Sequence, residues 1–504
     1  NTAMPLTDFN VTNFNLTDAV TRAAQDLARC RVLCARGEDA SAELAEPAQR
    51  AAVLCLTHAQ ATGALLRDAV TLLCELSARP EPPLARLGSE ALFRDVVERL
   101  NDSFAPESCA AYDRLFAQVI EFYRCLPAGS ALDARLRQFG LPDEAALLAR
   151  KARLGTPRLP ARDVRKALLL SRVTIGADVA VTSVLMAGLR QRYPQAEIVL
   201  LGSAKLRELF GSDARVRVRE LGYERGGTVL ARLQSWLHVV AAVEAEAQEG
   251  DVLVLDPDSR LTQLGLLPVL DDERYLFFES RRYGHETALP LGQLTARWWQ
   301  EISGTPEAVF PQLALPPEYS AFGQAIAQRL QQAGHTRIVS LSFGVGGNAA
   351  KRINAEFEAA LLRHLLRDAA LILDKGGTPD ERAQVDALTA SLRAAGHTVS
   401  ELNAANTNLE SASPAVVTWD GSIGAFAGLI AASDQYVGYD SSGQHLAAAL
   451  GVPTLTVFVN SNAPRFAERW RPFGKGAVNL VTAAPSDIWQ ATLQQTCTAL
   501  TSQR

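Results

Sequence analysis

Residues 433–458 read SDQYVGYDSSGQHLAAALGVPTLTVF and carry the clearest local pattern of the chain. Residues 435–438 form a short apolar run that predicts a buried strand, and a small polar turn follows at 440–443. An Ala- and Leu-rich helix is expected over 443–450, and a second strand over 455–458. Strand, turn, helix and strand in this order make the βαβ unit of a parallel sheet, so we predict an α/β fold.

The polar turn brings a carboxylate, two hydroxyls and backbone N–H groups to the start of a helix. Asp440, Ser441, Ser442 and Gly443 make up this turn. A helix N-terminus has unpaired donors and partial positive charge, which suits a phosphate group. Asp440 and Ser441 could equally act only as caps of the helix. The residues alone leave both interpretations open.

The same turn and helix resemble a known family. D-S-S-G-Q-H-L-A-A-A-L-G-V-P-T, residues 440–454, is similar to the signature of the heptosyltransferase-like glycosyltransferases, glycosyltransferase family 9. Asp440 and His445 keep the family spacing, although Ser442 is an extra residue before Gly443. The resemblance implies the GT-B architecture, which has two Rossmann-like domains. It also implies a nucleotide-sugar donor bound by Asp440, Ser441, Ser442, Gly443 and His445.

Length and composition fit a soluble enzyme. The chain has 504 residues, of which 48% are hydrophobic and 21% are charged, and this length corresponds to two to four domains. The net charge of −5 gives no indication of a nucleic-acid partner. The seven Cys lack metal-binding spacings and are interpreted as buried core thiols of a cytoplasmic protein. Asn1-Thr2-Ala3 is interpreted as a tag remnant before Met4, and no signal peptide is visible.

Apolar residues recur at helical spacing through the first 150 residues, with Pro- and Gly-containing breaks between the runs. The pattern predicts five to seven helices, and residues 154–162 read as a linker. We therefore expect an all-α domain over residues 1–153 that docks a partner or forms oligomers. His58 is assigned a structural role there, and the segment offers no candidate catalytic group.

Strands alternate with helices after the linker, which predicts two doubly wound domains. The expected strands are 167–170, 198–201, 216–221, 252–255, 275–278, 338–343 and 371–373. The first Rossmann-like domain is placed at 163–318 and the second at 319–504, with residues 289–317 leading from one to the other. The resemblance implies that the first domain holds the acceptor and the second holds the donor.

The loop after the first of these strands carries a candidate catalytic residue, Asp178. It starts a helix at the carboxyl edge of the expected sheet, where such folds bind ligands, and a simple helix cap is the alternative. The segment GADVAVTSVL, residues 176–185, is similar to the Gly-Asp-hydrophobic segment of the family, with Ala177 inserted. The Asp of the family is the proposed general base, so the resemblance implies that Asp178 takes the proton of the acceptor.

Two glycine-rich loops are the other candidate donor contacts. GVGGNAAK, residues 344–351, follows a strand; its glycines let the backbone approach a diphosphate, and Lys351 supplies charge. Lys351 matches the Lys of a Lys-Arg-Trp-Pro motif in the family, although the Trp-Pro is absent. DKGGTPDER, residues 374–382, matches a Gly-Gly and acid that lie near the nucleoside. The donor residues implied are Gly344, Gly346, Gly347, Gly377 and Glu381. Glu381 could instead be a helix N-terminal acid.

Two further polar groups lie in the first Rossmann-like domain. Asp256 and Asp258 form an Asp-x-Asp pair after a strand, which we interpret as a loop with acceptor contact rather than as a metal site. Arg281, Arg282 and His285 either contact an anionic acceptor or form a solvated loop, and the solvated loop is favoured. No metal site is expected.

The expected activity is that of a metal-independent, inverting glycosyltransferase. It would move a sugar, with heptose as a candidate, from a nucleotide sugar to an acceptor hydroxyl, as in bacterial lipopolysaccharide or other glycan assembly. Asp178 would act as base, and Lys351 would stabilise the leaving diphosphate. The donor, with an ADP-linked sugar as a candidate, is a substrate, and no cofactor is expected.

The expected acceptor is a glycan, a lipid-linked molecule or a protein. Peripheral contact with the inner membrane and homo-oligomers through the helical domain are further expectations. The alternative is a non-catalytic GT-B-like module that binds a sugar or nucleotide for the helical domain, which the altered loops motivate. Turnover of a nucleotide sugar separates the two. A Rossmann oxidoreductase is disfavoured because no G-x-G-x-x-G follows the first strand of either domain.

Overall fold

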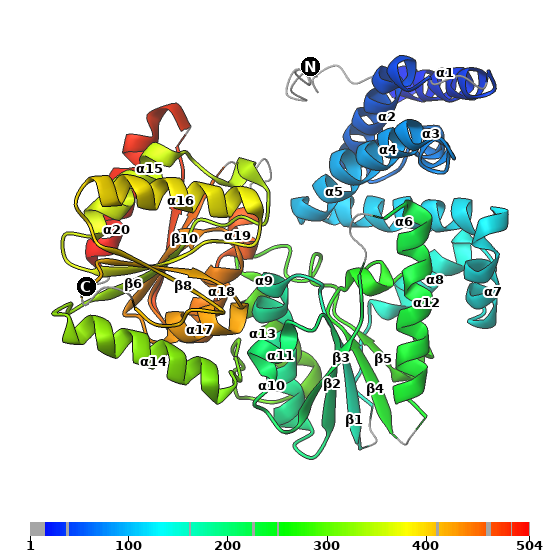
Figure 1. The fold of residues 1–504 in the computed structure, drawn as a ribbon. Coiled ribbons are helices and arrows are strands. Elements are labelled where there is room, and N and C mark those ends of the chain that lie inside the picture. Colours follow the sequence, from blue (N-terminus) through cyan, green and yellow to red (C-terminus); the bar gives the residue numbers. More distant parts are fainter. Residues whose placement is uncertain are drawn as a thin grey trace. The chain divides into compact units, whose positions relative to one another are not determined.

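The computed structural model of the chain describes residues 16–36, 40–160, 163–223, 227–248, 251–409, 413–459, 465–484 and 486–502. The chain divides into two compact units, whose elements are labelled in Figure 1. The first unit comprises residues 1–160 and 221–287, and the second comprises 161–220 and 288–504. No helix within the described ranges combines the length and the apolar character that crossing a membrane requires.

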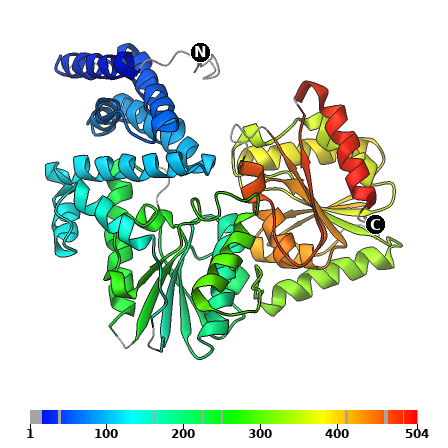
Figure 2. The ribbon, with the colours of Figure 1, turned by 180° about the vertical axis from the view of Figure 1, so that it is seen from behind.

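The N-terminal part of the first unit is helical, as predicted. Its helices are α1 Leu16–Cys34, α2 Ser41–Thr62, α3 Arg67–Ser77, α4 Pro82–Glu90, η3 Ala91–Val97, α5 Glu98–Ser103, α6 Pro106–Arg124, η4 Pro127–Gly129, α7 Ser130–Gln138 and α8 Glu144–Leu154. Proline begins α4 and α6, at a position where its missing N–H costs nothing. The helix α6 packs against α2, α3, α5 and α8, and most of its residues are buried. Figure 2 shows these helices from behind.

The cysteines are free thiols, but they are not all core residues. Cys30, Cys55, Cys74 and Cys109 are buried, as expected. The expectation is wrong for Cys125, which is exposed just after the end of α6. Cys34 and Cys497 are half-buried.

The first sheet has five strands in the order β3-β2-β1-β4-β5. They are β1 Lys166–Leu170, β2 Glu197–Gly202, β3 Val216–Glu220, β4 Val252–Asp256 and β5 Tyr275–Phe277. All five lie where the sequence predicts strands. The register of β1 and β2 is parallel, with Leu168 opposite Val199. After β1 the chain forms one helical run, made of α9 Ile175–Ala177, η5 Asp178–Thr182 and α10 Ser183–Arg192.

Of two helices beside the first sheet, one fits the prediction from the sequence and the other does not. The helix α12 Val229–Glu246 precedes β4, in line with the predicted alternation of strands and helices. Half of the segment 289–317, expected only to connect the domains, is the helix α13 Leu291–Ser303, and its Trp298 and Trp299 are buried. The five Pro of that segment suggested a linker, but four of them lie after α13.

The connection from β4 to β5 contains no crossover helix longer than a single turn. Residues 257–274 hold two three-residue turns, η6 Arg260–Thr262 and η7 Asp272–Arg274, around a buried apolar run. The carbonyls of this run need partners because it is shielded from water. Lys151 Nζ of α8 donates to Leu264 O at 2.6 Å, and Arg150 Nη1 donates to Gly265 O at 2.8 Å. The helical part therefore supplies hydrogen bonds that the β4–β5 connection does not make itself.

The second unit contains a seven-stranded parallel sheet, in the order β12-β11-β10-β6-β7-β9-β8. Its strands are β6 Ile338–Ser342, β7 Ala370–Asp374, β8 Val399–Asn403, β9 Val416–Asp420, β10 Gln435–Tyr439, β11 Thr454–Phe458 and β12 Val478–Thr482. Its helices are α14 Pro317–Gln332, α15 Ala355–Leu365, α16 Pro379–Ala394, α17 Ile423–Ala431, α18 Ser442–Ala449, α19 Phe466–Trp470 and α20 Trp489–Ser502. Helices α15, α16 and α20 cover one face of the sheet, and α14 and α17 cover the other (Figures 1 and 2).

The predicted fold class is confirmed. The chain is an α/β protein with two parallel, Rossmann-like sheets and a helical N-terminal region. The pattern of residues 433–458 folds as predicted into β10, the turn, α18 and β11, while β8, β9 and β12 were not among the expected strands. The domain boundaries at 153, 163 and 318 remain predictions.

Candidate functional site

Lys351, predicted as a catalytic residue, and Asp440, predicted as a donor contact, meet in an ion pair of 2.5 Å between Nζ and Oδ2. Asp440 follows the last residue of β10, and Lys351 ends the 3₁₀ turn Ala349–Lys351 that follows β6. These strands are neighbours in the parallel sheet, so their carboxyl ends lie at one edge. Asp440 is buried, whereas the Lys351 side chain is 30% exposed. The pair therefore offers an ammonium group at the rim of the sheet.

A buried ion pair fixes the backbone beside Lys351. Arg352 donates to both carboxylate oxygens of Glu358 through one edge of its guanidinium, from Nε to Oε1 at 2.9 Å and from Nη2 to Oε2. The Tyr439 hydroxyl donates to Glu358 Oε1 and accepts from Ile353 N. Burial raises the pKa of Glu358 despite these partners. Sequence reasoning identified Lys351 but missed Arg352 and Glu358, since the pair forms only once the chain is folded.

The turn before α18 is not explained by capping alone. Ser441 is the N-cap residue of α18, yet its side chain makes no capping hydrogen bond. The Asp440 carboxylate bonds Lys351 on one oxygen and Gln444 Nε2 on the other, at 2.7 Å. Neither side chain thus takes the role that the capping interpretation assigned to it. The eight-residue helix α18 therefore starts without a side-chain cap from Ser441, and a helix N-terminus of this kind suits an anion.

Gly443 is required by packing against Tyr436. A Cβ at Gly443 would overlap the Tyr436 hydroxyl and lie 2.7 Å from Cζ of the ring. Tyr436 is wholly buried, so the ring cannot move aside cheaply.

The substitution Gly443→Ala is therefore expected to lower the free energy of unfolding by about 1–3 kcal/mol, the usual effect of overpacking. Chemical denaturation measures this change. Gly222→Ala is the control, because a Cβ there meets nothing within 4 Å. The double variant Gly443→Ala/Tyr436→Phe should regain part of the loss. Equal stability of Gly443→Ala and the wild type would contradict the packing argument.

Asp178 is buried inside the helical run that begins at Ile175, not at its cap. Its N–H bonds Thr174 O in a helical hydrogen bond of 2.9 Å, so the N-cap interpretation is wrong. Its carboxylate accepts from Ser171 Oγ at 2.7 Å, from Arg172 N at 2.7 Å and from Thr182 Oγ1 at 2.8 Å. Burial raises the pKa of Asp178 to about 6, against the opposing effect of these three bonds. A carboxylate with this pKa is ionised at neutral pH and can still accept a proton.

The loop before Asp178 is strained. Val173 has a φ of +63°, in the left-handed region that a β-branched residue rarely adopts. Its N–H bonds Ser171 Oγ at 2.9 Å, and the same hydroxyl donates to Asp178. Strain of this kind concentrates at functional sites.

Gly176 brings the Asp178 helix against the 440–443 turn and the start of α18. A Cβ at Gly176 would lie 3.2 Å from Cδ2 of His445 and 3.4 Å from Cα of Ser442. The helix α18 accordingly packs on both α9 and η5. His445 is buried in this contact, and burial lowers its pKa to about 4, so the imidazole is neutral at pH 7. Two segments predicted to share one site are therefore adjacent.

Glu381 braces the two glycine-rich loops. Its Oε1 accepts from Val345 N at 2.7 Å and from Gly347 N at 3.3 Å, and its Oε2 accepts from Gly377 N at 2.9 Å and from Thr378 N at 3.1 Å. Burial acts to raise the pKa of Glu381, but these bonds outweigh it and hold the pKa below its ordinary value. Glu381 also completes a capping box with Thr378 at the start of α16. Its contact with a ribose remains a prediction.

Asp374 was missed by the sequence reasoning. It ends β7 and accepts from Ser342 Oγ at 3.1 Å, and the same hydroxyl accepts from Gly344 N at 3.3 Å. Burial raises the pKa of Asp374 to about 7. The signal available in the sequence was an acid at the end of an apolar strand, directly before Lys-Gly-Gly.

Asp256 and Asp258 are buried in the first unit. Asp256 accepts from Ser259 N, Thr262 Oγ1 and Tyr275 Oη. Asp258 pairs with Arg281 at 3.1 Å. No group of three or more metal-ligating side chains occurs in the ranges that the structure covers. Both carboxylates are thus engaged by their own surroundings.

The favoured view of Arg281, Arg282 and His285 as a solvated loop is wrong for Arg281. This residue is 2% exposed, and its guanidinium lies over the Tyr112 ring of α6, 4.4 Å from the centroid. Arg282 lies 3.6 Å from Asp113 of α6. Only His285 is largely exposed. The helical part covers this loop, which the sequence pattern of the loop itself does not reveal.

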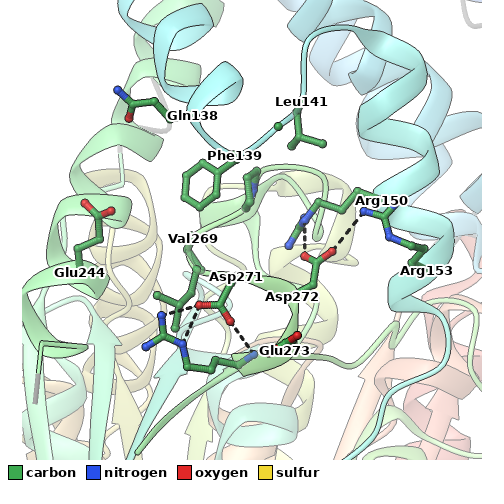
Figure 3. A pocket seen from close by; sticks show the side chains of 14 residues that line it. Gln138, Phe139, Leu141, Arg150, Arg153, Glu244, Val269, Asp271, Asp272 and Glu273 are labelled. Atoms are coloured by element: carbon green, nitrogen blue, oxygen red, sulfur yellow. Dashed lines mark hydrogen bonds and ion pairs between the residues drawn. The ribbon is translucent and has the colours of Figure 1, made fainter. Parts of the chain in front are cut away.

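A pocket of about 590 Å³ also lies in the first unit (Figure 3). It is lined by residues of α7, α8, α12 and the segment 268–274, and none of the predicted site residues is among them. Four of its charged side chains form two pairs, Arg150 with Asp272 and Arg274 with Asp271.

One protein-family model matches part of the chain. The model of glycosyltransferase family 9 (heptosyltransferase) matches residues 359–498. This range includes Glu381, the 440–443 turn and His445, so the resemblance drawn from residues 440–454 is confirmed for this part of the chain. No match was found among curated protein sequences.

Three solved structures are similar to the chain, each over 67% of it. A glycosyl transferase family 9 protein from Veillonella parvula has 13% identity, 98% of its own length covered and a TM-score of 0.47. The E. coli ADP-heptose lps heptosyltransferase II has 16% identity, 99% coverage and a TM-score of 0.43. The E. coli heptosyltransferase WaaC with ADP has 14% identity, 100% coverage and a TM-score of 0.43. Identities and TM-scores of this size carry no information on the substrate of the present chain.

Proposed function

We propose that this chain, whose residues 359–498 match glycosyltransferase family 9 (heptosyltransferase), transfers a sugar from a nucleotide-sugar donor to an acceptor hydroxyl with inversion at the anomeric carbon. The observation that carries the proposal is the contact of Gly176 with Ser442 and His445. Through this contact, the helix that carries Asp178, a buried carboxylate with a raised pKa, packs beside the N-terminus of α18. The Lys351–Asp440 pair lies at the same turn. A base and an anion site side by side are what this reaction needs.

The reaction step assigns one role to each side. Asp178 accepts the proton of the acceptor hydroxyl as the oxygen attacks the anomeric carbon. The bond from that carbon to the diphosphate oxygen breaks, and the nucleoside diphosphate leaves with the electron pair. Lys351 and the N-terminus of α18 stabilise the negative charge that develops on it. Ser441, Ser442, Gly443 and His445 line the donor side.

Glu381 and the glycine-rich loops bind the donor in this proposal. Gly344, Gly346, Gly347 and Gly377 allow the backbone to approach the nucleotide. Because the N–H groups of Val345 and Gly347 already bond Glu381, we assign most of the diphosphate charge to Lys351. An ADP-linked heptose is the first donor to test, because the family match is to heptosyltransferases.

The test is a panel of nucleotide sugars, with nucleoside diphosphate release and thermal stabilisation measured for each. A donor that binds the folded chain must raise its melting temperature. Release of the nucleoside diphosphate that depends on an added acceptor would support the transferase. Binding without turnover across all donors and acceptors would support the non-catalytic binding module instead.

We further propose that the transfer needs no divalent metal. Lys351 and a helix N-terminus can balance the charge of a diphosphate, and Asp256 and Asp258 are engaged in buried hydrogen bonds. Full activity is therefore expected after treatment with a chelator. Activity that is lost in chelator and restored by Mg²⁺ or Mn²⁺ would overturn this. The loss of activity in the Lys351→Ala variant measures how much the charge of the lysine contributes to the reaction.

The acceptor, the assembly and the location extend the proposal. We propose a cytoplasmic enzyme that acts on a glycan, a lipid-linked molecule or a protein, with contact to the inner membrane at its periphery. Homo-oligomers through the helical part are part of the same proposal. Light scattering and acceptor screening test these points separately from the donor panel.

A further inference from the structure

Gln444 lies directly behind Asp440 and is wholly buried. Its Nε2 donates to Asp440 Oδ1 at 2.7 Å and lies 3.3 Å from His445 Nε2. Its Oε1 accepts from Thr456 Oγ1 of β11 at 2.5 Å. A line of hydrogen bonds thus runs from the sheet through Gln444 to Asp440, and from there to Lys351.

The amide of Gln444 can face only one way. A reversed amide would put Oε1 against Asp440 Oδ1, and neither oxygen carries a proton to share when the carboxylate is ionised. With Nε2 on that side, Oε1 turns to the Thr456 hydroxyl, which donates to it. Thr456 is itself wholly buried and belongs to the strand next to β10. The sheet therefore sets the orientation of the amide.

The orientation of Asp440 follows from that of Gln444. Gln444 holds one carboxylate oxygen, and Lys351 pairs with the other. If the amide turns, a buried carboxylate oxygen loses its donor, which the folded chain does not tolerate without rearrangement. Movement of Asp440 would then move the ammonium group of Lys351.

We propose that Gln444 and Thr456 are positioning residues, which act through Asp440 to hold Lys351 where it meets the leaving diphosphate. This rests on the proposed glycosyl transfer. Both side chains are wholly buried, so they act by fixing their neighbours. Misplacement of a catalytic group by about 1 Å can cost up to 10²-fold in rate.

The test compares two substitutions at one position. Thr456→Val removes the hydroxyl at constant shape, and Thr456→Ser keeps it. Thr456→Val is expected to lower kcat about tenfold, whereas Thr456→Ser should stay close to the wild type. Thr454→Val is the matched control, because Thr454 is a buried threonine of the same strand whose hydroxyl bonds the local carbonyl of Val452 at 2.8 Å.

A second readout does not depend on activity. The rate at which an acylating reagent modifies Lys351 Nζ, followed by mass spectrometry, is expected to change in Thr456→Val and to be restored in Thr456→Ser. If the wild type turns over no nucleotide sugar, the proposed function fails, while the labelling rates still decide the coupling. Wild-type kcat and wild-type labelling in a folded Thr456→Val variant would overturn the inference. So would an equal loss in Thr454→Val.

Discussion

Asparagine in place of Asp178 is expected to lower turnover by roughly 10²–10⁴-fold, the usual contribution of a general base. Donor binding should change little, because the base serves the acceptor. The fold should tolerate the change: Oδ1 can still accept from Arg172 N and Thr182 Oγ1, and the Ser171 hydroxyl can turn to accept from the new amide. Kinetics and donor affinity of the folded variant measure the effect. Near-normal turnover would remove Asp178 from the mechanism.

The pH dependence of the transfer rate gives a second test of Asp178. Because burial raises the pKa of Asp178 to about 6, the rate should fall as the pH drops below about 6 and the base becomes protonated. Thr182→Val removes one donor to the carboxylate. It should therefore raise the pKa of Asp178 and shift this acid limb to higher pH. An acid limb at the same pH in wild type and Thr182→Val would contradict the assignment.

The raised pKa of Asp178 also makes the free energy of unfolding depend on pH. The ordinary pKa of an Asp is 3.8, and the folded chain raises that of Asp178 to about 6. The folded state therefore binds this proton more tightly than the unfolded state. The contribution of Asp178 to the free energy of unfolding falls as the pH rises from about 4 to about 6. Asp178→Asn removes this dependence, so the variant should be no less stable than the wild type near pH 7.

Removal of residues 1–160 is expected to leave a chain that does not fold. The helical part and residues 221–287 form one compact unit. Within it, Lys151 and Arg150 satisfy carbonyls of the buried β4–β5 connection and lie over the rings of Phe277 and Tyr275. Deletion exposes the buried leucines of that connection as well as these carbonyls. Soluble yield and circular dichroism of the truncated chain measure the outcome, and a soluble, folded product would contradict it.

Single substitutions on α8 separate this effect from general damage. Lys151→Met keeps the apolar stem but leaves Leu264 O without its donor, so it should lower the free energy of unfolding by about 1–3 kcal/mol. Arg153→Met is the control on the same helix. The Arg153 side chain is 63% exposed, and its ion pair with Asp272 is a long one, with 3.4 Å between Nη2 and Oδ2. It should change stability by less than about 0.5 kcal/mol. Equal effects of the two variants would argue against the role of Lys151.

The sequence predicted what depends on neighbours along the chain. The apolar runs and the turn of residues 433–458 gave β10, α18 and β11 almost to the residue. Lys351 and Asp440 were each assigned to the donor from local motifs, but their ion pair spans 89 residues. No periodicity or spacing contains such a contact, because the order of strands in the sheet creates it.

The same limit explains the other differences. Asp178 looked like a helix cap because the helix was expected to begin at Val179, four residues after its actual first residue, Ile175. The loop at Arg281 looked solvated because its charges are visible in the sequence, whereas the cover by α6 is not. The helical region looked like an added module because a Pro- and Gly-containing segment follows it. Its role in closing the β4–β5 connection depends on side chains more than 110 residues away.

The Glu381 carboxylate has a consequence for the affinity of the proposed nucleotide-sugar donor. Glycines lose more backbone freedom on ordering than any other residue. If the two glycine-rich loops became ordered only when a ligand binds, this loss of entropy would weaken the affinity. Glu381 ties both loops down before a ligand arrives, through four backbone bonds. These loops are therefore ordered when the chain folds, and a donor bound as proposed would enter a nearly rigid frame. Its affinity should accordingly depend on temperature as in rigid docking, without the large heat-capacity change of loops that fold around a ligand.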